Sequence, residues 1–405
     1  MAPEGTGFSF HGQALLEVDA NSRRNAIPIL SKTPNQSRSS FFGDVEFPLS
    51  EIGRGVLVGE VGHTVSADTA DMHAREGFVE FDLGRTAWFR IGRQVLRWGN
   101  GFAWSPTDFF GKETPSLLPR IAPQEGTDGA RIQVPFGSAA MLTGFLEARS
   151  ADADSLSGAV RAECSVGAAE FSVSGRAISG GTQELGLDAS TGILGARLYS
   201  GILWASGDLS PHARMRGGKL SIGEDRDHSQ IQATAGGWRE LPIGGTGQRL
   251  RIGIEGYWNS RGNPAGLLRD DSIRGYEHPV SLLPGSLQSL GCPDSVPCRF
   301  LQADKGTAAD FAVENGILVP GRWGRLYAAG LASLSKSVFD ELTSYAGMLV
   351  NLQDHSGVGM LGASWNGARS LSLQASGLWS WGSRRTEFAV FGVGPTLDML
   401  ATVSF

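Results

Sequence analysis

The last ten residues of the chain, Thr396 to Phe405, read TLDMLATVSF, and apolar side chains recur in them with a period of two. The regular apolar set is Leu397, Met399, Ala401, Val403 and Phe405. The intervening set is Thr396, Asp398, Leu400, Thr402 and Ser404. Successive side chains of a β-strand point to opposite faces, so this period predicts a strand that continues to the end of the sequence.

The same alternation recurs upstream, and the second face of several segments carries charge. In 74–84 and 247–260, for example, apolar side chains share one face and ionisable ones share the other. Water should therefore lie on one side of the sheet and an apolar medium on the other. The candidate water-facing residues are Glu76, Glu80, Asp82, Arg131, Arg161, Arg176, Arg249, Arg251, Glu255 and Arg325. They would act as selective charges or simply form solvated salt-bridge ladders.

Turn signals divide the chain into eighteen expected strands, within a range of sixteen to eighteen. Their ranges are 6–18, 38–49, 54–67, 74–84, 86–98, 127–136, 138–149, 156–165, 168–178, 182–190, 194–206, 228–239, 247–260, 323–336, 341–353, 357–366, 369–381 and 395–405. Short links alternate with long polar connections, as in an antiparallel up-and-down transmembrane barrel with short periplasmic turns and long outer loops. We expect one domain over 1–405, without a repeat of fixed period.

Composition favours a barrel over other membrane architectures. No run of about eighteen apolar residues is present, and the mean hydropathy of -0.10 is too polar for a helical membrane protein. A chain without such helices spans a bilayer only as a closed barrel. The alternative is a soluble β-sandwich or propeller. Turn spacing favours strands of about ten residues, the length that crosses a bilayer at a tilt, over the shorter strands typical of soluble sheets.

A final alternating strand that ends in Phe405 resembles the recognition signal of bacterial outer-membrane β-barrels. This resemblance covers about ten residues and implies insertion by the barrel assembly machinery into outer-membrane lipid. It also favours a porin-like protein, for which a homotrimer is expected. The first residues lack a basic segment followed by an apolar one, so we interpret the sequence as a mature chain without its signal peptide, with an added initiator methionine.

The connection 99–126 is the candidate constriction segment, because the third outer loop of general porins folds into the channel. Gly99 and Gly101 would allow the inward bend. Its candidate functional residues are Asn100, Trp104, Asp108 and Phe109. Alternatively, Trp98, Phe102, Trp104, Phe109 and Phe110 form an ordinary aromatic girdle and loop cluster.

Cysteine spacing suggests one disulfide. Cys292 and Cys298 lie in the long connection 261–322, which is rich in proline and glycine, and their separation suits a small loop disulfide in an oxidising compartment. The tied loop would lid a pore, present a surface to a partner, or only cap the barrel. Cys164 falls on an apolar strand face, where a small inert thiol is expected.

These features point to a passive channel for small polar solutes. The alternative is a structural barrel that sheathes or anchors a periplasmic or extracellular protein, such as the sleeve of a porin–cytochrome conduit. The net charge of -6 argues against nucleic-acid binding. No cofactor motif is present, and we expect no enzyme activity: Asp227-His228 and Asp354-His355 are adjacent pairs, whose side chains point apart on a strand.

Overall fold

The computed structural model describes residues 9–21, 37–50, 53–64, 69–84, 86–111, 125–148, 156–179, 182–216, 219–244, 247–263, 321–367, 370–383, 386–389 and 395–404. The strands in these ranges are β1 (Ser9–Asn21), β2 (Ser37–Ser50), β3 (Gly53–Thr64), β4 (Thr69–Leu83), β5 (Ala87–Gln94), β6 (Thr127–Phe136), β7 (Ala140–Ala148), β8 (Leu156–Val166), β9 (Ala169–Ile178), β10 (Gln183–Ile193), β11 (Ala196–Arg216), β12 (Lys219–Ile243), β13 (Gln248–Asn259), β14 (Leu326–Ser335), β15 (Leu342–Asn351), β16 (Ser356–Trp365), β17 (Leu371–Trp381) and β18 (Thr396–Ser404). Among the described residues, no helix is long and apolar enough to cross a bilayer.

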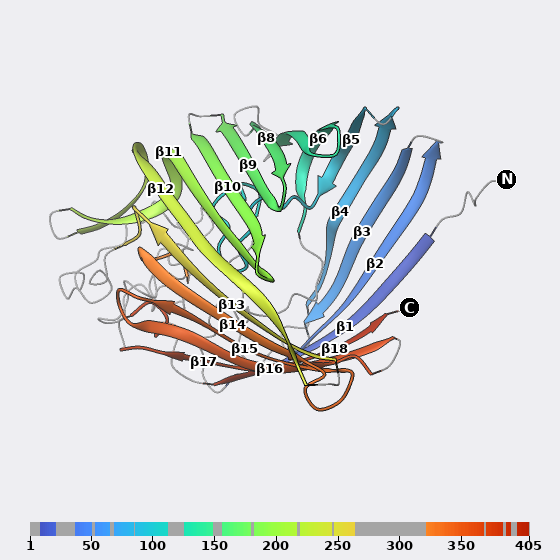
Figure 1. Ribbon diagram of the computed structural model, residues 1–405, viewed down its shortest axis with the longest axis vertical. Coiled ribbons are helices and arrows are strands. Elements are labelled where there is room, and N and C mark those ends of the chain that lie inside the picture. The colour runs from blue at the N-terminus through green and yellow to red at the C-terminus, as the bar shows by residue number, and fades with distance from the viewer. Residues whose placement is uncertain are drawn as a thin grey trace, which may run out of the picture.

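The described strands form one closed antiparallel barrel. Each pairs with its neighbours in sequence, within a single eighteen-stranded sheet. The last strand, β18, returns to β1, with Ala14 opposite Val403 and Leu16 opposite Ala401 (Figure 1). The predicted all-β, up-and-down barrel is therefore confirmed, and the terminal strand is the one that closes it.

Alternation along each strand separates two environments. On β13, Ile254 is 69% exposed and Trp258 is 42% exposed, whereas Glu255 and Tyr257 between them are 3% and 4% exposed. Large apolar side chains are similarly exposed on the same face of β10 and β11, at Leu187 and Ile202. A continuous exposed apolar surface of this kind would be unfavourable in water and suits the hydrocarbon of a bilayer.

Short turns at one end of the barrel use glycine for its backbone freedom. Gly84 follows β4 with a φ of 61°, and Gly167 joins β8 to β9 with a φ of 62°. A side chain would strain the backbone at such angles. Such tight turns join consecutive strands along this rim of the barrel.

The β11–β12 hairpin differs from the sequence-based expectation. The sequence predicted a long outer loop over 207–227, but the two strands remain paired as far as Arg216 and Lys219. Register shifts occur between Ser206 and Asp208 and between Asp208 and Pro211. Pairing of β10 with β11 stops at Ser206, so the extension is a two-stranded ribbon beyond the neighbouring strand. Irregular pairing at Pro211 interrupts the alternation on which the strand prediction depended.

The outward face of the closing strand can be tested by introducing a charge. Met399, on β18, is 52% exposed and lies on the apolar face. Met399→Arg should lower the free energy of unfolding from lipid vesicles by about 2–4 kcal/mol, because the guanidinium would enter hydrocarbon. Leu400→Arg is the matched control on the inner face and should cost less than about 1 kcal/mol. A urea titration that finds the larger loss for Leu400→Arg would contradict the assigned faces.

Candidate functional site

Part of the connection after β5, residues 99–111, lies inside the barrel against inward-facing side chains. Its first anchor is Glu255, on β13. The carboxylate accepts hydrogen bonds from the backbone amides of Phe102 (2.7 Å), Ala103 (3.2 Å) and Trp104 (2.6 Å). The hydroxyl of Tyr199, on β11, donates a further hydrogen bond to Glu255 at 2.5 Å. One carboxylate thus accepts hydrogen bonds from three backbone amides that would otherwise be buried without acceptors.

The second anchor is Asp188, on β10. Its Oδ1 accepts a 2.6 Å hydrogen bond from the hydroxyl of Thr107, within the inward segment. Its Oδ2 accepts from Arg161 at 3.2 Å and from Ser172 at 3.1 Å. The wall therefore holds the segment at two points, the amides of residues 102–104 and the hydroxyl of Thr107. Such charge-assisted hydrogen bonds are stronger than those between neutral groups.

Aromatic side chains also pack the inward segment against the wall of the barrel. Trp104 stacks on Tyr257, with ring centroids 5.4 Å apart, and its indole nitrogen donates to the carbonyl of Gly321 at 2.7 Å. Farther along, Phe110 makes edge contacts with Trp98 and with Phe145 of β7, at 5.1 and 4.8 Å. These contacts place apolar clusters inside the barrel rather than in a lipid-facing girdle.

A second inward segment, residues 386–389, is organised by Glu387. This side chain is fully buried and accepts hydrogen bonds from Gly321 N (2.6 Å), Tyr327 Oη (2.8 Å) and Asn351 Nδ2 (2.7 Å). Asp354 accepts the Glu387 amide at 2.8 Å. Burial raises the pKa of Glu387 to about 7, although the hydrogen bonds from its three donors act to lower it. The protonation state of the segment therefore changes near neutral pH.

Between β3 and β6 the inner wall is charged. Glu80 accepts hydrogen bonds from Arg54 at 2.5 Å and from Arg90 at 3.0 Å. Arg131 lies opposite Arg90 in the register of β5 and β6, so two guanidinium groups are neighbours on the inner face. Together with Gln133, they line a hollow of about 450 Å³. Charge of both signs surrounds this space.

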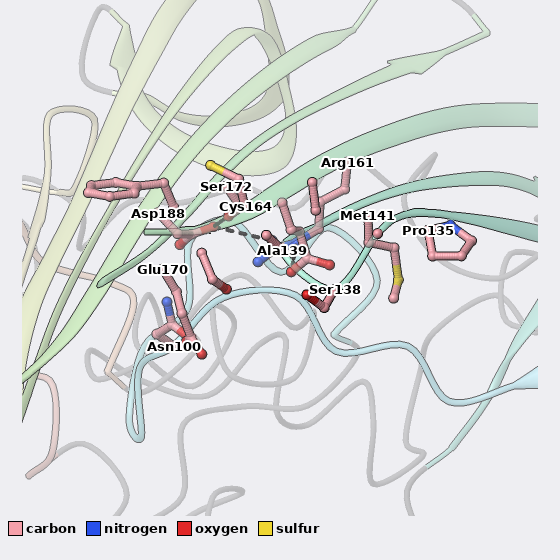
Figure 2. Close-up of a pocket in the computed structure, with 15 residues that line it drawn as sticks. Asn100, Pro135, Ser138, Ala139, Met141, Arg161, Cys164, Glu170, Ser172 and Asp188 are labelled. Carbon is pink, nitrogen blue, oxygen red and sulfur yellow. Dashed lines mark hydrogen bonds and ion pairs between the residues drawn. The ribbon is translucent and has the colours of Figure 1, made fainter. Parts of the chain in front are cut away.

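A second hollow, of about 310 Å³, lies beside the Asp188 anchor. Its lining includes Asn100 from the inward segment and Arg161, Glu163, Glu170 and Asp188 from the wall (Figure 2). Arg161 bonds both Glu163, at 2.9 Å, and Asp188. Three carboxylates and one guanidinium line this pocket, so it offers a polar surface with an excess of acidic groups to a solute.

The remaining candidate residues have varied surroundings. Glu76 accepts a 3.2 Å bond from the amide of Val95, whereas the guanidinium of Arg251 stacks over Trp238. Arg176 lies 3.6 Å from both Glu147 and Glu184 and donates to the carbonyl of Phe109.

Nearer the strand ends, Arg249 lies 3.5 Å from Glu240, and Arg325 donates to the carbonyl of Gly262 at 2.8 Å. The register of β4 places Asp82 on the same inner face as Glu80. Asp108 accepts the amide of Trp98 at 3.1 Å and therefore shapes the inward segment itself.

Three predicted features lie outside the described residues: the Cys292 and Cys298 pair, most of the connection 261–322, and Phe405. Cys164 is a free, exposed thiol on β8. Within the described ranges, no three His, Cys, Asp or Glu side chains form a group that could hold a metal ion. Of the adjacent Asp-His pairs, Asp354 is bonded to Ser356 and to the Glu387 amide, which is a structural role.

Four residues of the site were not among the candidates predicted from sequence: Tyr199, Asp188, Thr107 and Glu387. The first three are ordinary polar residues whose roles depend on contacts with distant parts of the chain. Glu387 carried a usable signal: it precedes the apolar run Phe-Ala-Val-Phe at 388–391, inside an expected outer loop. An apolar run in a loop that should be solvated indicates that the loop is packed against something.

The Glu255 anchor can be tested by removing its carboxylate. Glu255→Ala should accelerate hydrogen exchange at residues 102–104 by about 10- to 100-fold, since a hydrogen bond to a charged group contributes about 1.5–3 kcal/mol. Glu240→Ala is the control, because its carboxylate lies on the neighbouring strand beside Arg249. Unchanged exchange in Glu255→Ala would show that the aromatic contacts alone hold the segment.

The raised pKa of Glu387 predicts a pH dependence of stability. A carboxyl group with a raised folded-state pKa binds its proton more tightly in the folded chain, so this contribution is complete below the ordinary pKa of 4.5 and is lost as pH rises to about 7. Glu387→Gln should reduce the fall in unfolding free energy between pH 5 and pH 8 by up to about 3 kcal/mol. Glu341→Gln, in an exposed turn, should retain the wild-type fall. An equal fall in both variants would contradict the assignment.

Comparisons with known proteins inform the fold. No family model and no curated protein matches the sequence. The structure resembles Pseudomonas aeruginosa OprD, with a TM-score of 0.55 at 10% identity over 98% of this chain and 94% of that chain. It also resembles the P. aeruginosa outer membrane protein OpdK, with a TM-score of 0.54 at 8% identity over 98% and 99% of the two chains. The chain therefore has the fold of a porin-like outer-membrane β-barrel.

Proposed function

We propose that the chain is an outer-membrane channel for the passive diffusion of small polar solutes. The observation that supports this most directly is the charged hollow between β3 and β6, where Arg54, Glu80, Arg90 and Arg131 face the barrel interior. Charges on the inner face indicate an aqueous path, since ionised groups are costly to bury without water or partners. The lipid-facing wall carries the apolar side chains that such a channel requires.

The connection 99–126 would act as the constriction of this channel. The anchors at Glu255 and Asp188 support this role, because they fix residues 99–111 inside the barrel. Asn100, Trp104, Asp108 and Phe109 would then shape the narrow part of the path. The charges on the wall opposite the segment would set the preference for cations or anions.

Its partners would be those of an outer-membrane porin. Phe405 would be recognised by the barrel assembly machinery, and the exposed apolar face would contact outer-membrane lipid. A homotrimer remains our expectation for the assembly. Chemical cross-linking in native membranes would test it, with monomers alone as the opposing result.

A sleeve around another protein is less well supported. A partner inside the barrel would need the inner faces of β10 to β16, but the chain's own residues 99–111, 321–324 and 386–389 contact side chains there. The two functions separate in a planar bilayer. The purified protein alone should give ohmic conductance steps as a channel, whereas a sleeve should give none until its partner is added.

Charge substitutions in the hollow should change ion selectivity in opposite directions. Glu80→Gln leaves the surrounding arginines less neutralised and should shift the permeability ratio toward anions by about two- to fivefold, while Arg131→Gln should shift it toward cations. A unit charge about 4 Å away contributes on the order of 1 kcal/mol in water. Arg93→Gln is the control, because Arg93 pairs with Asp128 on the opposite, outward face. Unchanged reversal potentials in both lumen variants, with conductance intact, would exclude this wall from the ion path.

A further inference from the structure

The outward surface of β11 to β13 contains an apolar groove of about 770 Å³. Its floor follows β12, where Ala235 and Gly237 replace the large side chains found on the neighbouring strands. The residues paired with Gly237 across the sheet are Leu198 on β11 and Ile254 on β13. Ala235 pairs with Gly256 on β13, which in turn pairs with Ala328 on β14. Because all three residues are small, the floor of the groove is wider there.

Gly237 is buried, because the side chain of Leu198 covers the position where a side chain would stand. A β-carbon built there would approach Leu198 Cδ2 at 2.7 Å and the carbonyl oxygen of Arg197 at 2.8 Å. Leu198 is therefore one wall of the groove, and the open part of the floor is formed by the exposed small residues Ala235 and Gly256. The walls are exposed apolar side chains, Leu198 at 45% and Ile254 at 69%. A hollow that opens outward and is lined by apolar groups suits the acyl chain of a lipid.

At one end of the groove lies Arg239, two residues beyond Gly237 on the same outward face. It is exposed, and within the described part of the chain it makes no hydrogen bond or ion pair. The inward-facing charged residues nearby do have partners: Glu240 lies 3.5 Å from Arg249, and Arg251 stacks on Trp238. An unpaired guanidinium facing hydrocarbon is unfavourable unless it reaches the polar interface.

Arg239 is placed to reach that interface. It lies four residues before the end of β12 at Ile243, close to the rim of short turns. An arginine side chain reaches from such a position to the headgroup layer, where its donors match the oxygens of a phosphate group.

We propose that this groove binds a glycerophospholipid of the leaflet that borders the short turns. Arg239 holds the phosphate, and one acyl chain lies along the floor formed by Ala235 and Gly256, beside the walls of Leu198 and Ile254. The site is separate from the proposed solute path, because its walls and its guanidinium face outward.

Charge complementarity favours lipid over a second copy of the chain. Along the described strands, apart from the β11–β12 ribbon beyond Ser206, the register places one carboxylate, Asp128, on the outward face. That carboxylate already accepts two bonds from Arg93, at 2.9 and 2.6 Å. The described lipid-facing wall of a second copy therefore offers Arg239 no available acid, whereas every phospholipid offers a phosphate.

The test is native mass spectrometry of the full-length protein with two lipids that share acyl chains, dioleoylphosphatidylglycerol and dioleoylglycerol. The wild type should retain the phospholipid about five- to tenfold better than the diacylglycerol, because only the former carries the phosphate. Arg239→Gln should abolish this preference. Ala235→Leu should reduce retention of both lipids by filling the groove.

Two matched controls make the result specific. Ala346→Leu adds the same side chain on the outward face of β15, outside the groove, and Arg249→Gln removes an inward arginine beside Glu240. Both should retain the wild-type preference, and heat-modifiable gel migration should show that all variants fold.

Undiminished phospholipid preference in Arg239→Gln would overturn the proposal. A second result would also overturn it: the wild type forms an oligomer that retains no lipid, and Ala235→Leu dissociates that oligomer. The groove would then be an interface between copies of the chain. Neither result depends on conductance, so this test can fail while the channel proposal stands.

Discussion

Backbone hydrogen bonding in an apolar solvent is the constraint on which the rest of this structure depends. A strand edge in hydrocarbon leaves amides and carbonyls without partners, at a cost of several kcal/mol each. The chain removes both edges by pairing β18 with β1 along a register from Gln13–Ser404 to Asn21–Thr396. The closed ring then fixes which side chains face lipid and which face the interior.

Closure leaves the interior to be organised by contacts between distant residues, and two carboxylates do most of this. Glu255 holds the amides of residues 102–104, and Glu387 connects Gly321, Tyr327 and Asn351. Glu255 serves three backbone donors, whereas Glu387 serves one, the amide of Gly321, together with side chains of β14 and β15. The indole of Trp104 links the two systems through the carbonyl of Gly321. Loss of either carboxylate would leave buried donors unsatisfied, which costs more than a hydrogen bond contributes.

The strands were predictable from sequence because their information is local: a period of two is visible in any ten residues, as in 396–405 or 247–260. Glycine turns were visible for the same reason. The interior was not, because a bond such as Glu255 to Trp104 joins residues 151 positions apart, and nothing near Glu255 distinguishes it from a solvated charge. The β11–β12 extension was missed because Pro211 and the register shifts break the alternation.

The two faces also explain why arginine has different surroundings on adjacent strand positions. An inward arginine can pair with the carboxylates of the inner face. Arg90, for example, donates a hydrogen bond to Glu80 at 3.0 Å. An outward arginine has no such choice. Arg93 depends on Asp128, opposite it in the register, whereas Arg239 lies beside Ala196 and Ile252. On the outward face, an arginine therefore either pairs with the rare outward carboxylate, as Arg93 does, or has no acidic partner among the described residues, as is the case for Arg239.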